Sequence, residues 1–311
     1  MPEIDAVLPL LPRDFERFTI LARSLERFMT DLGHLYVVVP DRFHASLAPL
    51  LEPYSRRLPL RVIKEQLWVP EMPQLRHLPG WYKQQLVKLA AAEFVNSDFF
   101  LTLDADVVCT RPVSHQKLVI DGRAPCHAIA GCDHPDWYRG SEAVLALSAK
   151  RSDILHNVTP CVLAREGVLQ LIEHLNRVAL ERPYASGIRG AQQRLFFSLH
   201  RLGRHRARPP WRGWLAASRP WAEYATYFTF LEATGRYERY HFDSERCVYD
   251  VDRSVWHKQF QIETMDPEPL FRSEGPPYFV VIQSNSGIDA KRTWRVLEPW
   301  LGAAPTFLGA P

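Results

Sequence analysis

Apolar residues in the first hundred positions follow two patterns. One is the continuous run typical of buried strands, and the other is the spacing typical of helices. Continuous apolar runs predict strands at residues 4–10, 35–39 and 60–64. Apolar residues at helical spacing predict helices at residues 15–29, 45–51 and 80–95. Strands that alternate with helices are typical of a doubly wound, mostly parallel sheet, so the predicted fold class is α/β.

The pattern is looser after residue 113, where only short apolar pieces occur, at residues 128–129 and 143–147. Further along, residues 157–163 lead into a predicted helix at 165–180, followed by a predicted aromatic helix at 221–234 and a late strand at 279–283. The basic, Pro-rich residues 201–220 are predicted to form a long loop. Because no internal repeat or interdomain linker is visible, we expect a single domain over residues 1–311.

One apolar run ends in two carboxylates. Residues 99–108 read FFLTLDADVV, which predicts a buried strand that terminates at Asp104 and Asp106. Side chains two apart on a strand share a face, so both carboxylates can reach one bound object. Unpaired buried charges are costly, and a divalent metal that carries a phosphate-rich ligand offsets that cost. Ligands of open α/β sheets bind at the carboxyl ends of strands, which favours this hypothesis over a solvated turn.

The composition of the chain is that of an ordinary globular protein. Its formal charge of +3 over 311 residues gives no general argument for a nucleic-acid partner. The five cysteines contain no C-x-x-C pair, which indicates reduced thiols and a cytoplasmic location. We find no signal peptide and no apolar stretch of the roughly 18 residues that a membrane span needs. Peripheral association with the inner face of a membrane is compatible with this composition.

The order of these motifs resembles that of the GT-A glycosyltransferases, and in particular an uncharacterised bacterial family grouped with them. The resemblance spans roughly residues 4–294 and rests on GWYKQQLVKLAAA, FLTLDADVV, TPCVL and WAEYATY, in that order. It implies a GT-A-like fold with a nucleotide-binding half at about 1–113 and an acceptor-binding half at about 114–300. The implied activity is transfer of a sugar from a nucleotide-diphosphate sugar to a glycan or glycolipid hydroxyl, in bacterial surface polysaccharide synthesis.

The resemblance also implies roles for residues on the donor side. Asp106 would ligate Mn²⁺ or Mg²⁺, and Asp104 would hold the ribose or a metal-bound water. A metal on the departing diphosphate acts as a Lewis acid for the leaving group. Related families often carry His in the late strand, where this chain has Gln283, so His257 and Gln283 are both candidates for a further ligand. Lys83 and Lys88, on the helix before the Asp-x-Asp strand, are candidates for contact with the diphosphate; a solvated helical lysine is the alternative.

On the acceptor side, the resemblance makes Glu223 the candidate general base of an inverting transfer. A glutamate near a helix N-terminus is also favourable for purely structural reasons, because it interacts with the helix dipole. In a retaining enzyme Glu223 would position the acceptor instead. Further candidates for acceptor contacts are Asp133, His134, Asp136, Trp137, Tyr138 and Thr159, with Trp137 and Tyr138 able to stack on a sugar ring.

Three other interpretations of the sequence are weaker. Cys126, His127, Cys132 and His134 do not match a common zinc-site spacing. A sugar-phosphate nucleotidyltransferase usually has a Gly-rich loop after its first strand, and the corresponding segment here, LPLLPRDF, contains no glycine. The Arg-rich residues 201–213 suggest a nucleic-acid or anion-binding patch, but one such loop in a nearly neutral protein is usually a solvated surface.

Overall fold

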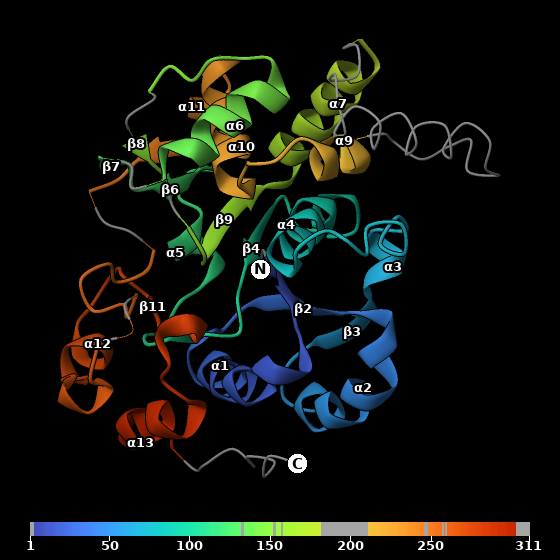
Figure 1. The fold of residues 1–311 in the computed structure, drawn as a ribbon. Helices are drawn as coiled ribbons and strands as arrows, with labels where there is room; N and C mark the ends of the chain where they lie inside the picture. The colour runs from blue at the N-terminus through green and yellow to red at the C-terminus, as the bar shows by residue number, and fades with distance from the viewer. Residues whose placement is uncertain are drawn as a thin grey trace.

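A five-stranded sheet is the centre of the computed structural model, which describes residues 3–131, 134–151, 154–156, 158–181, 211–245, 248–256, 258 and 260–302 (Figure 1). Its strands are β1 (Ile4–Pro9), β2 (Leu32–Val39), β3 (Leu60–Lys64), β4 (Phe99–Thr102) and β9 (Cys161–Ala164). Their order is β3-β2-β1-β4-β9, and all neighbours are parallel except β4 and β9. The prediction of a mixed α/β fold with a mostly parallel sheet is therefore confirmed.

Helices connect successive parallel strands, as the alternating pattern predicts. These helices are α1 (Phe15–Phe28), α2 (Asp41–Ser55), α3 (Glu65–Trp68) and α4 (Gly80–Ala90). In α1 the apolar residues at helical spacing, Phe18, Leu21 and Leu25, are fully buried. Each such burial contributes roughly 1.5–3 kcal/mol, so this face holds α1 in place beside the sheet.

A second group of helices gathers at the β9 end of the molecule (Figure 1). They are α6 (Pro135–Leu145), α7 (Arg165–Glu181), α9 (Trp211–Ala217), α10 (Glu223–Ala233) and α11 (Tyr237–Tyr240). Helix α10 is buried on all sides from Glu223 to Glu232 and packs against α6 and α7. Gly140 brings α6 close to the chain before α10, since a Cβ there would lie only 1.5 Å from the carbonyl oxygen of Pro220.

Three small strand pairs complete the fold, together with short helices. The pairs are β5 (Val107–Cys109) with β11 (Phe279–Val281), β6 (Ala124–Cys126) with β10 (His241–Asp243), and β7 (Ile129–Ala130) with β8 (Ile154–Leu155). The remaining helices are α5 (His115–Leu118), α12 (Glu268–Arg272), α13 (Ala290–Leu301) and the 3-10 turns Pro12–Asp14, Ala91–Glu93, Ile262–Thr264 and Ser284–Ser286. No helix of the described residues is long and apolar enough to cross a membrane.

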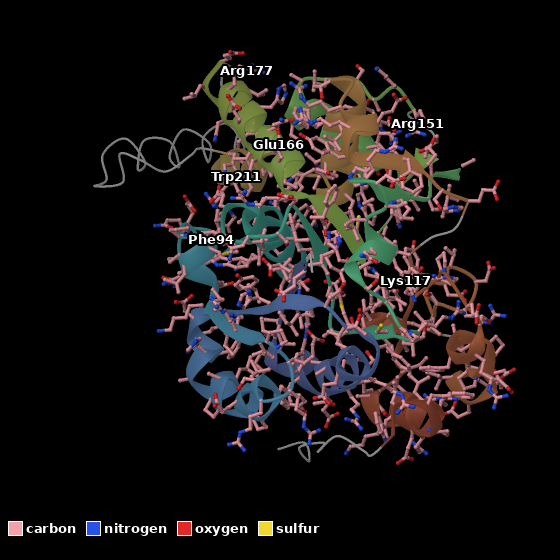
Figure 2. All side chains as sticks on the ribbon, turned by 180° about the vertical axis from the view of Figure 1, so that it is seen from behind. Phe94, Lys117, Arg151, Glu166, Arg177 and Trp211 are labelled. Carbon is pink, nitrogen blue, oxygen red and sulfur yellow. The ribbon has the colours of Figure 1, made fainter. Side chains whose placement is uncertain are left out.

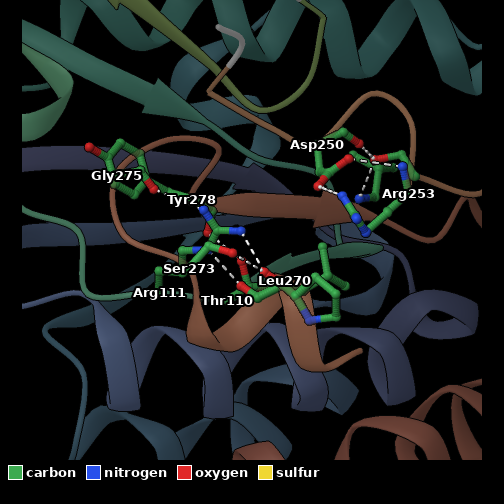
Figure 3. A network of polar contacts seen from close by, with 11 residues as sticks. Thr110, Arg111, Asp250, Arg253, Leu270, Ser273, Gly275 and Tyr278 are labelled. Atoms are coloured by element: carbon green, nitrogen blue, oxygen red, sulfur yellow. Dashed lines mark hydrogen bonds and ion pairs between the residues drawn. The ribbon is translucent and has the colours of Figure 1, made fainter. Parts of the chain in front are cut away.

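Arg111 attaches the late α12 segment to β5 (Figure 3). Its guanidinium donates to the carbonyl oxygens of Leu270 at 2.7 Å, Pro269 at 2.8 Å and Gly275 at 3.0 Å. The side chain is buried, and these carbonyls occupy its donors. Arg111 is thus a structural tie between segments more than 150 residues apart.

The prediction that the buried strand beginning at Phe99 terminates at Asp104 and Asp106 is wrong at its carboxyl end. Strand β4 ends at Thr102, and Asp104 and Asp106 lie in a turn before β5. The chain leaves the central sheet because β5 pairs with β11 instead, and the carbonyl of Asp106 accepts from the backbone N–H of Ile282 at 2.9 Å. The two carboxylates are therefore brought together by the turn and not by strand alternation.

The prediction of a continuous loop at residues 201–220 is also wrong over its second half, where α9 forms. Its tryptophans, Trp211 and Trp214, are buried in the core and outweigh the basic residues between them. Arg212 is buried as well and pairs with Glu93 at 2.6 Å, so it is not part of an anion-binding surface. Residues 201–210 lie outside the described part of the chain.

Other boundaries differ from prediction by a few residues. The helix predicted at 80–95 ends at Ala90 and continues as a 3-10 turn. The helix predicted at 45–51 is longer in both directions, and the helix predicted at 221–234 begins at Glu223, because Ala222 is extended. Hydrophobic periodicity locates the middle of a helix more precisely than its ends.

Candidate functional site

A cleft of about 890 Å³ lies between the carboxyl edge of the central sheet and the second group of helices. Segments that follow β1 and β4 form one wall, and α4, α6 and α10 contribute to the others. This is the position at which open α/β sheets bind ligands. Of the residues predicted from sequence, those that line the cleft are Lys88, Asp104, Asp106, His134, Trp137, Tyr138, Thr159, Glu223 and Gln283.

Among the described residues, two of those predicted do not line the cleft. Lys83 is half-buried on another face of α4, where its charge acts on the carboxyl of Glu65. Asp136 is exposed and pairs with Arg139 within α6. These two corrections follow from helix geometry, since each side chain points away from the face that meets the cleft. The predicted residues Asp133 and His257 lie outside the described residues.

Lys88 is the centre of a buried polar network on the cleft wall. Its Nζ lies 2.9 Å from Asp104 Oδ1 and 3.2 Å from Glu223 Oε1. It also donates to Thr159 Oγ1 at 2.9 Å and to the hydroxyl of Tyr224 at 3.3 Å. These contacts occupy the ammonium, so Lys88 holds two carboxylates in position and is not free for the diphosphate contact that the sequence suggested.

The ionisable groups of this network are strongly perturbed. Burial by itself would lower the pKa of Lys88, but Asp104, with Tyr224 and Glu223, raises it well above its usual value. Burial raises the pKa of Glu223, and Lys88 opposes that shift. Burial and the negative charge of Asp104 raise the pKa of Asp106 to about 6, although the backbone N–H of Ser284 donates to Asp106 at 2.7 Å.

The oxygen ligands of this site fit a hard divalent cation. Asp104, Asp106 and Glu223 contribute three carboxylates, against which Lys88 supplies one ammonium within ion-pair distance. Among the described residues no three His, Cys, Asp or Glu side chains converge on one point. Mg²⁺ and similar ions are commonly held by one or two carboxylates together with substrate phosphates. The protein would thus supply Asp104, Asp106 and the amide oxygen of Gln283, and a ligand would complete the coordination.

Comparison of the sequence with protein families gives one match, to a family model described as "Family of unknown function (DUF6492)", over residues 1–304. The chain belongs to DUF6492. A search of curated proteins finds no match.

Several solved structures resemble the DUF6492 chain at low identity. The galactosyltransferase LgtC, in complex with donor and acceptor sugar analogs, is 10% identical with a TM-score of 0.46, over 97% of this chain and 98% of that one. Mouse xyloside xylosyltransferase 1 is 10% identical with a TM-score of 0.41, over 93% and 100%. Glucosyl-3-phosphoglycerate synthase from Mycobacterium tuberculosis, with Mn²⁺ and UDP, is 16% identical with a TM-score of 0.35, over 58% and 67%.

Several residues of the DUF6492 cleft are not evident from the sequence pattern. Tyr224 bonds through its hydroxyl to Thr102 Oγ1 and Thr159 Oγ1, each at 2.8 Å. Gln85 accepts from the backbone N–H of Glu223 at 2.8 Å. The signal for Gln85 was available, because it precedes Lys88 by three residues and thus shares its helix face.

Two arginines near the first strand were also missed. Arg13 and Arg17 line the cleft on the same side as the carboxylates. Arg17 donates to the carbonyl of Ile288 at 2.6 Å, which ties α1 to the segment after β11, whereas the side chain of Arg13 is 78% exposed. Only the fold brings these residues to Asp106, since about ninety positions separate them in sequence.

Proposed function

We propose that this DUF6492 protein is a metal-dependent glycosyltransferase of the GT-A type. It transfers a sugar, a hexose or a related one, from a nucleotide-diphosphate sugar to a hydroxyl of a glycan or glycolipid acceptor. The observation that carries the proposal is the cluster in the cleft, where Asp104 and Asp106 lie beside the buried pair of Lys88 and Glu223. The proposed setting is bacterial surface polysaccharide synthesis on the cytoplasmic side of the membrane.

On the donor side, Asp104, Asp106 and Gln283 would hold Mn²⁺ or Mg²⁺. When bound, such an ion supplies Lewis-acid stabilisation for the diphosphate as it leaves. Arg13, whose largely exposed guanidinium lies 3.5 Å from Asp14 through Nε, would contact phosphate oxygens, for which its planar fork is well suited. Lys88 holds the carboxylate of Asp104 in one orientation, which limits the reorganisation needed on binding.

On the acceptor side, Glu223 would take the proton of the attacking hydroxyl. Its buried carboxylate lines the cleft, and its raised pKa favours acceptance of a proton. The Lys88 ammonium, 3.2 Å from Oε1, favours the ionised form of Glu223 against the effect of burial. We favour inversion at the anomeric carbon, because a base placed on the acceptor side suits direct displacement.

The test of this proposal is calorimetric titration with UDP, GDP, CDP and dTDP, each with and without Mn²⁺. We expect one nucleotide to bind only with metal, and Asp106→Ala to weaken that binding about a hundredfold or more because a metal ligand is lost. Asp136→Ala is the matched control, since Asp136 is exposed and outside the cleft. Failure of all four nucleotides to bind, or unchanged affinity in Asp106→Ala, would contradict the proposal.

The nucleotide identified in this way narrows the donor to its sugar conjugates. Proton NMR of the product then gives the anomeric configuration and decides between inversion and retention. Retention would assign Glu223 to positioning of the acceptor.

A further inference from the structure

We propose that the acceptor side of the cleft is a binding subsite for a pyranose ring, formed by Trp81, Trp137 and the side-chain amide of Gln85. This inference rests on the proposed function and names the class of acceptor. None of the sequence motifs assigned a role to Trp81 or Gln85.

The two tryptophans form an aromatic platform from different helices. Trp81 is in the first turn of α4 and Trp137 in that of α6, and their ring centroids are 5.2 Å apart with an interplanar angle of 35°. Both line the cleft; Trp81 remains 42% exposed, whereas one face of Trp137 is covered by the ring of His134, with centroids 3.9 Å apart. A large ring left open in a concave site is more informative than a scattered surface residue. Such rings bind the flat C–H face of a pyranose and leave its hydroxyls free for polar partners.

Gln85 has an unused, buried hydrogen-bond donor on the helix face that carries Trp81. Its side chain is only 1% exposed and lines the cleft. The backbone N–H of Glu223 donates to Gln85 Oε1, which fixes the orientation of the side-chain amide. The amide nitrogen, Nε2, is then the atom left to donate a hydrogen bond. Nε2 has no hydrogen-bond partner among the described residues. An unsatisfied buried N–H costs about 1–3 kcal/mol, so this group is suited to a ligand oxygen.

The subsite is connected to the proposed base. Trp81, Gln85 and Lys88 follow one another at helical spacing on α4, so they share a face. Gln85 contacts the backbone of Glu223, while Lys88 contacts its carboxylate and that of Asp104. A pyranose on the tryptophans that accepts from Gln85 Nε2 would therefore present a neighbouring hydroxyl to Glu223.

The test is saturation-transfer NMR with methyl glycosides of glucose, galactose, mannose and N-acetylglucosamine, and with acyclic sorbitol as the comparison. We expect at least one pyranoside to bind, with saturation strongest on its ring C–H protons, and sorbitol not to bind. Trp81→Ala should weaken binding about tenfold or more and Trp81→Phe should restore much of it. Trp300→Ala is the matched control, since Trp300 stacks on Phe271 outside the cleft.

Gln85→Glu removes the amide donor and puts a carboxyl in its place. The glutamate keeps an oxygen for the N–H of Glu223 but loses Nε2, and we expect pyranoside binding to fall about tenfold. Nucleotide titration with Mn²⁺ is repeated on every variant as a separate measure of the donor site. If the protein binds nucleotide but no pyranoside, the inference is overturned and the proposed function is not. The same holds if Trp81→Ala binds the pyranoside as tightly as the wild type does. If the wild-type protein binds none of the nucleotides, the proposed function is contradicted instead. Pyranoside binding that depends on Trp81 would support the subsite even in that case.

Discussion

Two partly buried clusters in this molecule each join one basic side chain to two carboxylates, yet the burial cost of their carboxylates is offset to different degrees. Arg151 contacts Glu232 at 2.6 Å and Asp243 at 2.8 Å, at the end of the molecule formed by the second group of helices (Figure 2). His156 adds its imidazole at 2.8 Å from Glu232. In the cleft, Lys88 contacts two carboxylates, and the third, Asp106, forms no ion pair with a described residue.

The pKa shifts follow this difference. Burial would raise the pKa of Glu232, but His156 and Arg151 lower it below its ordinary value, and the pKa of Asp243 is lowered as well. In the cleft, burial raises the pKa of both Glu223 and Asp106. The partners of Glu232 and Asp243 more than offset the effect of burial, whereas the partners of Glu223 and Asp106 do not.

The largest expected effect is that of Glu223→Gln on sugar transfer. Removal of a general base costs about 10²–10⁴ in rate, while nucleotide binding with Mn²⁺ should be retained because Asp104 and Asp106 are unchanged. The measurements are transfer rate and calorimetric affinity on the same preparation. Glu166→Gln, at an exposed site on α7, is the control. Transfer close to the wild-type rate would make Glu223 a structural residue.

The next effect concerns the cluster of Arg151, Glu232 and Asp243. Arg151→Met should lower the free energy of unfolding and leave the affinity for the donor nucleotide unchanged. We expect a loss at the lower end of the roughly 3–5 kcal/mol typical of a broken buried pair, because 28% of the Arg151 side chain is exposed. Chemical denaturation at pH 7 measures it. Arg239→Met, which breaks an exposed pair with Glu166, should cost less than about 0.5 kcal/mol.

The same variant has a defined pH dependence. Carboxylates with lowered pKa values contribute stability above their ordinary pKa values near 4, and this stability is lost as the pH falls through the folded-state values. The difference between wild type and Arg151→Met should therefore be greatest near pH 7 and shrink in acid. A difference that stays constant down to acid pH would show that Arg151 acts by packing alone.

The smallest expected effect is on the stability of metal-free protein. Asp106→Asn removes one excess charge but keeps an oxygen for the N–H of Ser284, so we expect a gain on the order of 1 kcal/mol. Added Mn²⁺ should raise the melting temperature of the wild-type protein and leave that of the variant unchanged. Equal responses of both proteins to Mn²⁺ would place the metal elsewhere.

Local patterns predicted the elements well where a continuous apolar run or helical apolar spacing marks them. The strands at β1 to β3 and the helices α1, α4, α7 and α10 follow from apolar spacing. The prediction failed at Asp104 to Asp106, where pairing with β11 ends the strand, and at α9, where buried tryptophans outweigh basic neighbours. Both failures depend on partners distant in sequence.

Hydrophobic periodicity and strand ends are local properties, so they specify the α/β class and place Asp104 and Asp106 just after a strand. The tertiary fold brings Lys88 to Glu223, 135 residues away, and adds Gln85 to this site. It also separated Lys83 and Asp136 from the cleft and buried Arg212. The physical reason is that the pairing and pKa of a charge depend on burial and on distant partners, which spacing along the chain does not specify.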